Sequence, residues 1–249
     1  MFDKKKRIVF LAVLFTATFA VMPMSYAMHI MEGYLSPKYS VAWGIIALPF
    51  ILWGMASIQK MLNKNPKNIT LLAMSGAFIF VISSLKIPSV TGSCSHMTGT
   101  GLGAILFGPA PVAVLGLIVL LFQAILLAHG GITTLGANTF SMAIAGPFLS
   151  FIVYKICKKC SVPQKISVFL AAFLGDIFTY IITSVQLAVA YPSQNGGVMA
   201  SAMKFLGVFA PTQLPLAVIE GILTVIIIIA LQTYAAPEMN MIQFTKEEA

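Results

Sequence analysis

The stretch CSHMTGTGLGAILFGP, residues 94–109, decides the topology expected for this chain, because it is interpreted as a membrane crossing that hydropathy alone does not reveal. Its apolar core predicts a helix of about 20 Å, which is shorter than the roughly 30 Å hydrocarbon thickness of a bilayer. In the 249-residue chain around it, 59% of the residues are hydrophobic and only 9% are charged. This composition indicates an integral membrane protein and excludes a soluble fold.

Six longer apolar runs can each cross a bilayer as a helix. They cover residues 41–58, 69–85, 110–127, 135–156, 166–189 and 208–231. Lysines follow the first run (Lys60, Lys64, Lys67) and the fourth run (Lys155, Lys158, Lys159, Lys165). Both lysine-rich loops are therefore predicted to be cytoplasmic.

The two lysine-rich loops can lie on the same side of the membrane only if an even number of crossings separates them. Three apolar runs lie between them, which is an odd number. The stretch 94–109 is therefore predicted to be an additional crossing, short and buried in the bundle. Its glycines agree, since small residues such as Gly99 and Gly103 let neighbouring helices approach closely. A phosphate-binding loop is excluded because no strand precedes these glycines.

The first 27 residues have the parts of a cleavable signal peptide: a basic stretch at 4–7, an apolar stretch at 8–22 and small residues before Ala27. The alternative is an uncleaved first transmembrane helix. Both interpretations put Met28 outside the cytoplasm. The sequence thus predicts an all-α membrane protein, a bundle of about seven transmembrane helices in one polytopic domain of residues 28–249, with its C-terminus cytoplasmic.

All three histidines, His29, His96 and His129, fall on loops of the outer side. Histidine is the commonest metal ligand. After cleavage, the Met28 amine, the Met28–His29 peptide nitrogen and the His29 imidazole can close a five-membered and a six-membered chelate ring on one ion. Such a planar set suits Ni(II) or Cu(II) and can hold cobalt, but it suits tetrahedral Zn(II) poorly.

His96 is the natural fourth nitrogen of this set, because it stands at the outer mouth of the short crossing. His129 receives no role from the pattern. The alternative for His29 and His96 is that both are interfacial histidines bonded to the backbone.

Three segments resemble the signature sequences of a known family: MHIMEGYLSP (residues 28–37), SHMTGTGLGAILFGP (95–109) and HGGITTLGANTFSMAIAGP (129–147). They are similar to the signature segments of the CbiM/NikM family, the substrate-specific components of energy-coupling-factor transporters for cobalt and nickel. The motif sequences are closer to those of the cobalt branch. The resemblance implies that Met28, His29 and His96 coordinate the transported Co(II), or Ni(II), and that no permanent cofactor is present.

The resemblance also implies partners: a small membrane subunit (CbiN), a transmembrane coupling subunit (CbiQ) and a cytoplasmic ATPase (CbiO), in an importer that feeds cobalamin biosynthesis. The sequence agrees in one respect, since it has no GxxxxGK[ST] loop with which to hydrolyse ATP. We therefore expect a transport subunit of the cell membrane rather than an enzyme. The net charge of +8 is explained by lipid and orientation, so no nucleic-acid partner is expected.

Two carboxylates, Asp176 and Glu220, fall near the middle of their spans, where an ionised group is costly and usually marks a function. Either they are protonated or hydrogen-bonded to neighbours such as Thr179, Gln186 or Thr224, or they couple a gradient-driven secondary carrier to an ion. The second interpretation is the alternative to an ATP-driven transporter.

Two further groups of residues are open to more than one interpretation. Thr133, Thr134 and Asn138 are expected to hydrogen-bond the metal-binding loop, or else one of the threonines caps the following helix. Cys157 and Cys160 have zinc-like spacing but form only one pair, so no metal site is expected there.

Overall fold

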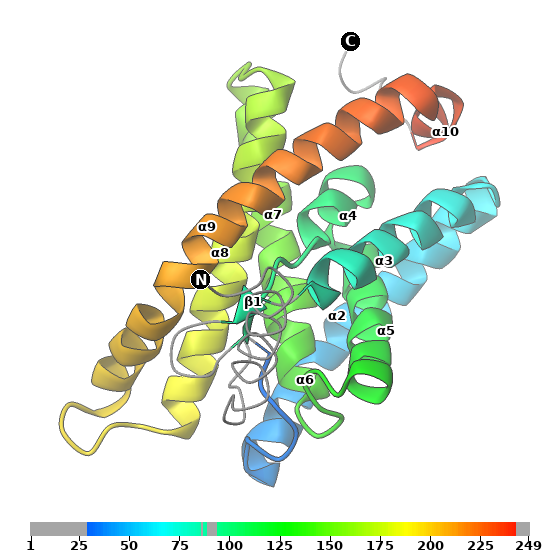
Figure 1. The fold of residues 1–249 in the computed structure, drawn as a ribbon. Helices are drawn as coiled ribbons and strands as arrows, with labels where there is room; N and C mark the ends of the chain where they lie inside the picture. Colours follow the sequence, from blue (N-terminus) through cyan, green and yellow to red (C-terminus); the bar gives the residue numbers. More distant parts are fainter. Residues whose placement is uncertain (1–28, 86, 89–93, 243–249) are drawn as a thin grey trace, which may run out of the picture.

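The computed structural model describes residues 29–85, 87–88 and 94–242, and it is a helical bundle (Figure 1). The predicted signal peptide and Met28 lie outside these residues. The helices are α2 (Pro37–Lys64), α3 (Asn68–Ser84), α4 (Thr100–Phe107), α5 (Pro109–Leu127), α6 (Leu135–Asn138), η2 (Thr139–Ala145), α7 (Gly146–Lys159), α8 (Gln164–Ala190), α9 (Gly197–Tyr234) and α10 (Ala236–Met241). Two short strands, β1 (Ile87–Pro88) and β2 (Cys94–Ser95), pair antiparallel, with Ile87 opposite Ser95.

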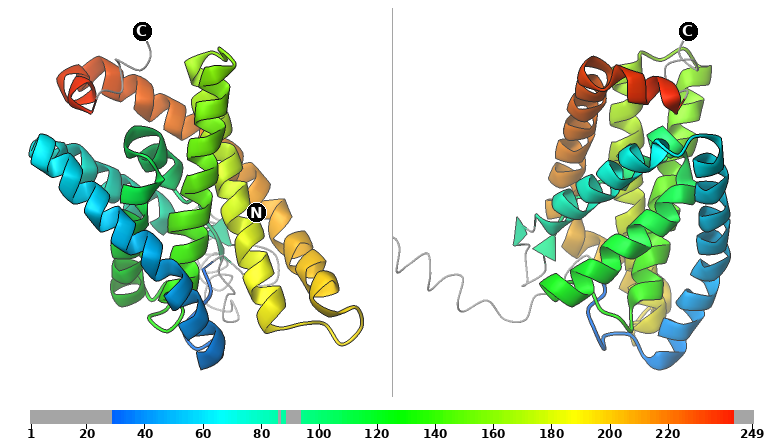
Figure 2. Two further views of the ribbon diagram at one scale, coloured as in Figure 1. Left: turned by 180° about the vertical axis from the view of Figure 1, so that it is seen from behind. Right: turned by 90° about the vertical axis from the view of Figure 1, so that its right-hand side faces the viewer.

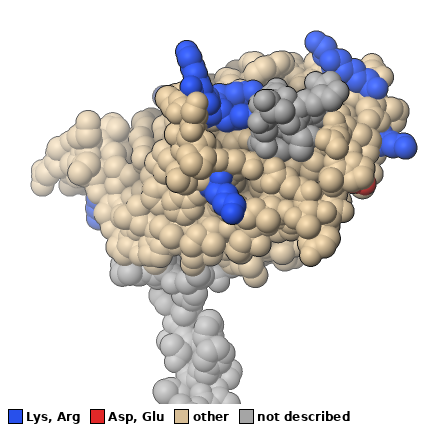
Figure 3. Space-filling view, turned by 90° about the horizontal axis from the view of Figure 1, so that it is seen from above, with Lys and Arg blue, Asp and Glu red and all other residues tan. Residues whose placement is uncertain are grey.

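The long helices run between two ends of the molecule (Figures 1 and 2). The basic end, uppermost in Figure 1, carries the α2–α3 and α7–α8 turns and α10. The histidine end carries residues 29–36, 128–134 and 191–196. Seen onto the basic end, Figure 3 shows most of its charged side chains to be lysine or arginine. The lysines expected on cytoplasmic loops, after the first and fourth runs, belong to the helix ends and turns at this end.

Five helical segments of the described chain are long and apolar enough to cross a membrane. They are Pro37–Lys64, Pro109–Leu127, Leu135–Lys159, Gln164–Ala190 and Gly197–Tyr234. The helix α3 is apolar but has only 17 residues, a length of about 25 Å. The class predicted from the sequence, an all-α membrane bundle, is therefore confirmed.

The segment that decided the topology forms α4, and every residue from Thr100 to Leu106 is buried. The expected short, buried helix is thus present, packed against α5, α7 and α8. It has 8 residues, about 12 Å, and is shorter than the 20 Å expected. The reason is that glycines with positive φ bound it, Gly99 in the left-handed conformation at φ 68° and Gly108 at φ 82°. A Cβ on Gly101 would lie 2.9 Å from the Cα of Ala172, so α4 and α8 need a glycine there.

Two elements differ clearly from those expected. The last helix, α9, begins at Gly197 rather than at residue 208, so most of the predicted outer loop 191–207 is helical. Lys204 and Gly207 interrupt the apolar run there, but residues 198–206 contain no glycine or proline and include strong helix formers such as Ala200, Ala202 and Leu206. The fourth run, residues 135–156, is not a continuous α-helix, since residues Thr139–Ala145 form the π-helix η2.

Candidate metal centre

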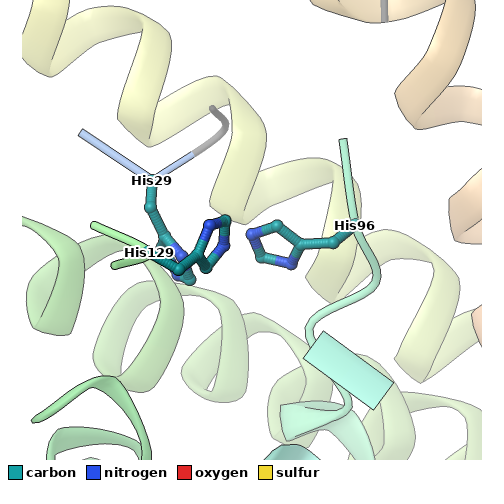
Figure 4. A group of neighbouring side chains, drawn as sticks. All are labelled: His29, His96 and His129. Carbon is teal, nitrogen blue, oxygen red and sulfur yellow. The ribbon is translucent and has the colours of Figure 1, made fainter. Parts of the chain in front are cut away.

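Three separate loops bring the imidazoles of His29, His96 and His129 together (Figure 4). The ring centroids lie 4.4 Å apart for His29 and His96, 4.5 Å for His29 and His129, and 4.9 Å for His96 and His129. One nitrogen from each ring lies within 4.8 Å of the other two, and all three residues are buried. This histidine triad is a potential set of ligands for one transition-metal ion.

His29 stands on residues 29–35, the N-terminal strap, which lies against the loop and helix that follow His129. The side-chain amide of Asn138 holds Ile30 as a neighbouring strand would: Ile30 N–H donates to its Oδ1 at 2.8 Å, and its Nδ2 donates to the Ile30 carbonyl at 3.0 Å. The Thr134 hydroxyl donates to the same carbonyl at 2.6 Å. The backbone next to His29 is therefore fixed by two side chains that are far away in the sequence.

The outer part of the strap is held at the surface. Glu32 N–H donates to the Gly130 carbonyl at 3.2 Å, and Gly33 N–H donates to the Thr133 hydroxyl at 3.2 Å. Thr133 N–H in turn donates to the Glu32 carboxylate at 3.2 Å. Hydrogen bonds from Thr133 hold the pKa of Glu32 below its usual value. The prediction that Thr133, Thr134 and Asn138 hydrogen-bond the loop that carries His29 is confirmed, and Thr134, the residue before α6, makes no side-chain cap bond.

The two nitrogens of His29 have different surroundings. Its Nε2 lies 3.1 Å from the sulfur of Met142, a buried residue of the π-helix η2. The chelate rings expected from the sequence would use Nδ1, so this contact is compatible with them. Sequence reasoning missed Met142, because the wider π-helical turn changes which residues face the strap.

The imidazole of His96 is fixed through its other nitrogen. Nδ1 lies 2.8 Å from the carbonyl oxygen of Met97. A carbonyl can only accept, so Nδ1 carries the hydrogen and Nε2 carries the lone pair that a metal needs. Histidines that bind metals usually donate their second ring nitrogen to a carbonyl or carboxylate in this way.

His129 follows the end of α5 directly. The chain turns there through Ala128 in a left-handed conformation, φ 46°, and His129 N–H donates to the Gln123 carbonyl at 3.1 Å. Its ring is inclined at 67° to that of His29 and at 72° to that of His96. The sequence assigned it no role, although its place on the same predicted side was a signal. The structure makes it a member of the triad.

Asp176 and Glu220 are both buried and hydrogen-bonded, but their partners are not those expected. Glu220 accepts hydrogen bonds from Thr98 and Gly99, and Asp176 accepts one from Gln213. The expected neighbours, Thr179, Gln186 and Thr224, donate instead to main-chain carbonyls, those of Gly175, Ala137 and Glu220. Sequence spacing suggested partners on the same helix, whereas the structure supplies partners from another element.

The cysteine pair forms no comparable cluster. Cys157 is a buried free thiol and Cys160 an exposed one. Among the described residues, the histidine triad is the group of three or more potential ligands that lie close enough to share an ion.

An apolar helical bundle with a buried cluster of imidazoles near one end is the architecture of a membrane protein with a potential transition-metal site. The particular family is given by sequence: the CbiM family, described as the cobalt uptake substrate-specific transmembrane region, matches residues 29–239, and the chain belongs to it.

Similar proteins agree with this assignment. The chain is 67% identical over 240 residues to a cobalt transport protein CbiM of Lachnoclostridium phytofermentans, covering 96% of each chain. It is 56% identical to the protein of that name from Chlorobium limicola, covering 94% of this chain and 92% of the relative. A crystal structure of a truncated transition metal transporter has a TM-score of 0.71 at 25% identity, covering 83% of this chain and 99% of that one.

Proposed function

We propose that this protein is the substrate-specific component of an energy-coupling-factor transporter and captures Co(II) on the outer side of the cell membrane. The observation that carries the proposal is the buried histidine triad, in which the His96 tautomer suits a ligand through Nε2. The proposal is further supported by membership of the CbiM family. Co(II) is the substrate here and not a resident cofactor.

The proposed coordination uses four nitrogens: the Met28 amine freed by cleavage after Ala27, the Met28–His29 amide, His29 Nδ1 and His96 Nε2. The strap supports it, since its bonds to Asn138 hold His29 beside His96. The amide nitrogen must give up its proton to bind. Binding should therefore release protons and weaken as the pH falls.

The triad supports a second coordination, in which three imidazoles bind the ion and the N-terminal amine does not. One ring nitrogen from each histidine can reach the same ion, because these nitrogens lie within 4.8 Å of one another. The two coordinations differ in what they require of His129 and of the amine, so they can be separated by experiment.

The proposed topology has seven crossings, with the mature N-terminus outside and the C-terminus in the cytoplasm. It adds α3 and the α4 segment to the five long helical segments. The lysines of the basic end support this orientation, because positive charge gathers on the cytoplasmic side. The histidine end then faces the source of the ion.

The energy for transport is proposed to come from the partner subunits CbiN, CbiQ and CbiO, and the imported cobalt to feed cobalamin synthesis. The hydrogen bonds that Glu220 and Asp176 make to other elements favour this over a gradient-driven carrier, which would need these carboxylates for ion coupling. Cobalt uptake that stops when the partner ATPase is inactivated would support the proposal. Uptake that continues unchanged would favour the carrier.

The N-terminal amine provides the sharpest test of the chelate. The active protein should begin at Met28, and blocking its amine should greatly weaken Co(II) binding. One extra Gly between Ala27 and Met28, with cleavage kept after Ala27, moves the histidine to the third position, where the amine, two amides and imidazole can supply all four nitrogens. His96 should then become dispensable for binding. If blocking the amine leaves the affinity unchanged, side chains alone hold the ion.

The choice of cobalt over nickel has its own test, since both ions accept nitrogen ligands. Cells grown with both ions supplied equally should yield purified protein that contains mainly cobalt. A nickel content that exceeds cobalt would assign the protein to nickel uptake within the same family.

A further inference from the structure

The segment that carries His96 is neither helix nor sheet for most of its length. Residues 95–99 are all buried, and only Ser95 belongs to the two-residue strand β2. Buried main-chain groups outside regular structure need hydrogen-bond partners from elsewhere. In this segment the partners come from α9, the last long helix of the chain.

The first partner is Glu220 of α9, whose side chain is 1% exposed. Its carboxylate accepts three hydrogen bonds: from Thr98 N–H at 2.5 Å, from the Thr98 hydroxyl at 2.8 Å and from Gly99 N–H at 3.0 Å. The left-handed Gly99 lets two successive N–H groups face the same carboxylate, a concave arrangement suited to an anion. The carboxylate also meets the N-terminus of α4, where a negative charge is favoured.

The second partner is Gln213, two helical turns before Glu220 and so on the same face of α9. Its Nε2 donates to the His96 carbonyl at 3.1 Å and to the Asp176 carboxylate at 2.7 Å. Because Asp176 belongs to α8, it fixes the orientation of the Gln213 amide from a second helix. Both helices thus contribute to one main-chain group of the ligand residue.

We propose that Glu220, Gln213 and Asp176 form a clamp that positions His96 for the metal, with Glu220 as its main member. The inference rests on the proposed function, in which His96 is a ligand. The clamp holds the main chain at two points, one on each side of Met97. These are the His96 carbonyl before it and the N–H groups of Thr98 and Gly99 after it. The ring is held independently by its bond to the Met97 carbonyl. The His96 imidazole therefore has little freedom to move toward an ion that lies in a different position.

This role differs from the ion-coupling role that intramembrane carboxylates suggest. The Glu220 oxygens are directed at donors of the His96 segment. Outer partners of a metal site typically contribute a factor of 10 to 100 to the affinity, because they fix the ligand geometry.

The test is Glu220→Gln in the purified chain beginning at Met28, titrated with Co(II) alone. The amide keeps one acceptor oxygen but turns its NH2 donor toward the N–H group of either Thr98 or Gly99, so the segment must shift. We expect Co(II) binding about 10- to 100-fold weaker. The visible absorption of the bound Co(II) should move toward that of His96→Ala, with helix content unchanged by circular dichroism.

Thr224→Val is the matched control, because Thr224 is buried one turn further along α9 and its hydroxyl donates only within the helix, to the Glu220 main-chain carbonyl. It should leave the absorption spectrum of bound Co(II) as in the parent. A second readout is non-additivity: in a His96→Ala background, Glu220→Gln should weaken binding little further, since the ligand it positions is gone. A purely structural role would lower the affinity by the same factor in both backgrounds.

The outcomes separate the inference from the proposed function. A parent that binds Co(II) and a His96→Ala variant that binds it much more weakly, while Glu220→Gln keeps the parent affinity and spectrum, overturn the clamp and leave the function intact. A parent that binds no Co(II) overturns both. If Glu220→Gln does not fold, Thr98→Val and Gln213→Leu decide: weakened binding with a shifted spectrum supports the clamp, and parent-like binding in both overturns it.

Discussion

Two non-helical segments carry proposed ligands, and they are held in opposite ways. The N-terminal strap, residues 29–35, reaches the surface, and Glu32 and Gly33 are exposed. Most of its hydrogen-bond partners are neutral groups from one short stretch, residues 130–138; in addition, Met142 contacts His29 and the Tyr191 hydroxyl donates to the Tyr34 carbonyl. Residues 95–99 are wholly buried. The Glu220 carboxylate of α9 bonds this segment directly, and the Asp176 carboxylate of α8 acts on it through Gln213.

The proposed site therefore has two halves. The docked half is the strap with His29, and the built-in half is residues 95–99 with His96. Undocking the strap breaks hydrogen bonds at one end of the molecule and leaves the helices in place. Moving His96 would require α8 and α9 to rearrange, because Asp176 and Glu220 belong to these helices. Amide exchange in the metal-free protein should therefore be faster in the strap than at Thr98 and Gly99.

The largest effect should come from the built-in half, through His96→Ala. The variant removes one of four proposed nitrogens, and the clamp keeps the emptied position in place, so no other group can take it. Affinity for Co(II) should fall by more than the roughly 100-fold that loss of an outer partner costs. Calorimetric titration of the purified protein measures this, with circular dichroism as a check on folding. An unchanged affinity would exclude His96 from the site.

In the docked half, Asn138→Leu should have the next largest effect. It leaves the buried N–H of Ile30 without its acceptor, whereas the Ile30 carbonyl keeps its bond from Thr134. A buried donor that loses its partner costs about 1–3 kcal/mol. If that cost falls on the docked strap, Co(II) binding weakens roughly 5- to 150-fold.

Thr134→Val is the control for Asn138→Leu, because it removes one of two donors to the Ile30 carbonyl and leaves the other in place. Its effect on Co(II) binding should be smaller. Equal losses from the two variants would contradict the assignment of the Ile30 N–H as the critical group.

His129→Ala tests whether His129 is a metal ligand or only packs against the rings of His29 and His96. If His129 only packs against the other two rings, its removal costs the energy of aromatic contacts, about 0.5–1.5 kcal/mol, and weakens binding by roughly 2- to 12-fold. Calorimetric titration beside His96→Ala compares the two directly. A loss as large as that of His96→Ala would favour coordination by three imidazoles.

The sequence was sufficient for the parts of this structure that depend on composition and periodicity. It predicted the helical bundle, the buried α4 and the docking of the strap on Asn138 and Thr134. It did not identify His129 as part of the cluster, nor Thr98 and Gln213 as partners of the carboxylates. These contacts join residues 33 to 122 positions apart in the sequence, and helix packing, which local pattern does not encode, brings them together.

The smallest effect should come from acid, and it should act on the docked half alone. Docking lowers the pKa of Glu32 through hydrogen bonds from Thr133, so the ionised carboxylate stabilises the docked strap above its usual pKa of 4.5. That contribution is lost as the pH falls through the lower, docked value. In metal-free protein, amide protection of Gly33 and Thr133, corrected for intrinsic exchange, should therefore fall as the pH drops from about 5 to 3.

Glu32→Gln should remove this dependence, because the amide keeps an acceptor oxygen and does not titrate. Protection at Thr98 and Gly99 should be the same for parent and variant across the range, since the hydrogen bonds of Glu32 join it to Gly130 and Thr133, in the loop on which the strap docks. If the parent and Glu32→Gln lost strap protection equally, another group would be responsible for the acid response. If Thr98 and Gly99 followed the strap, the two segments would be one cooperative unit, and the division between a docked and a built-in half would be wrong.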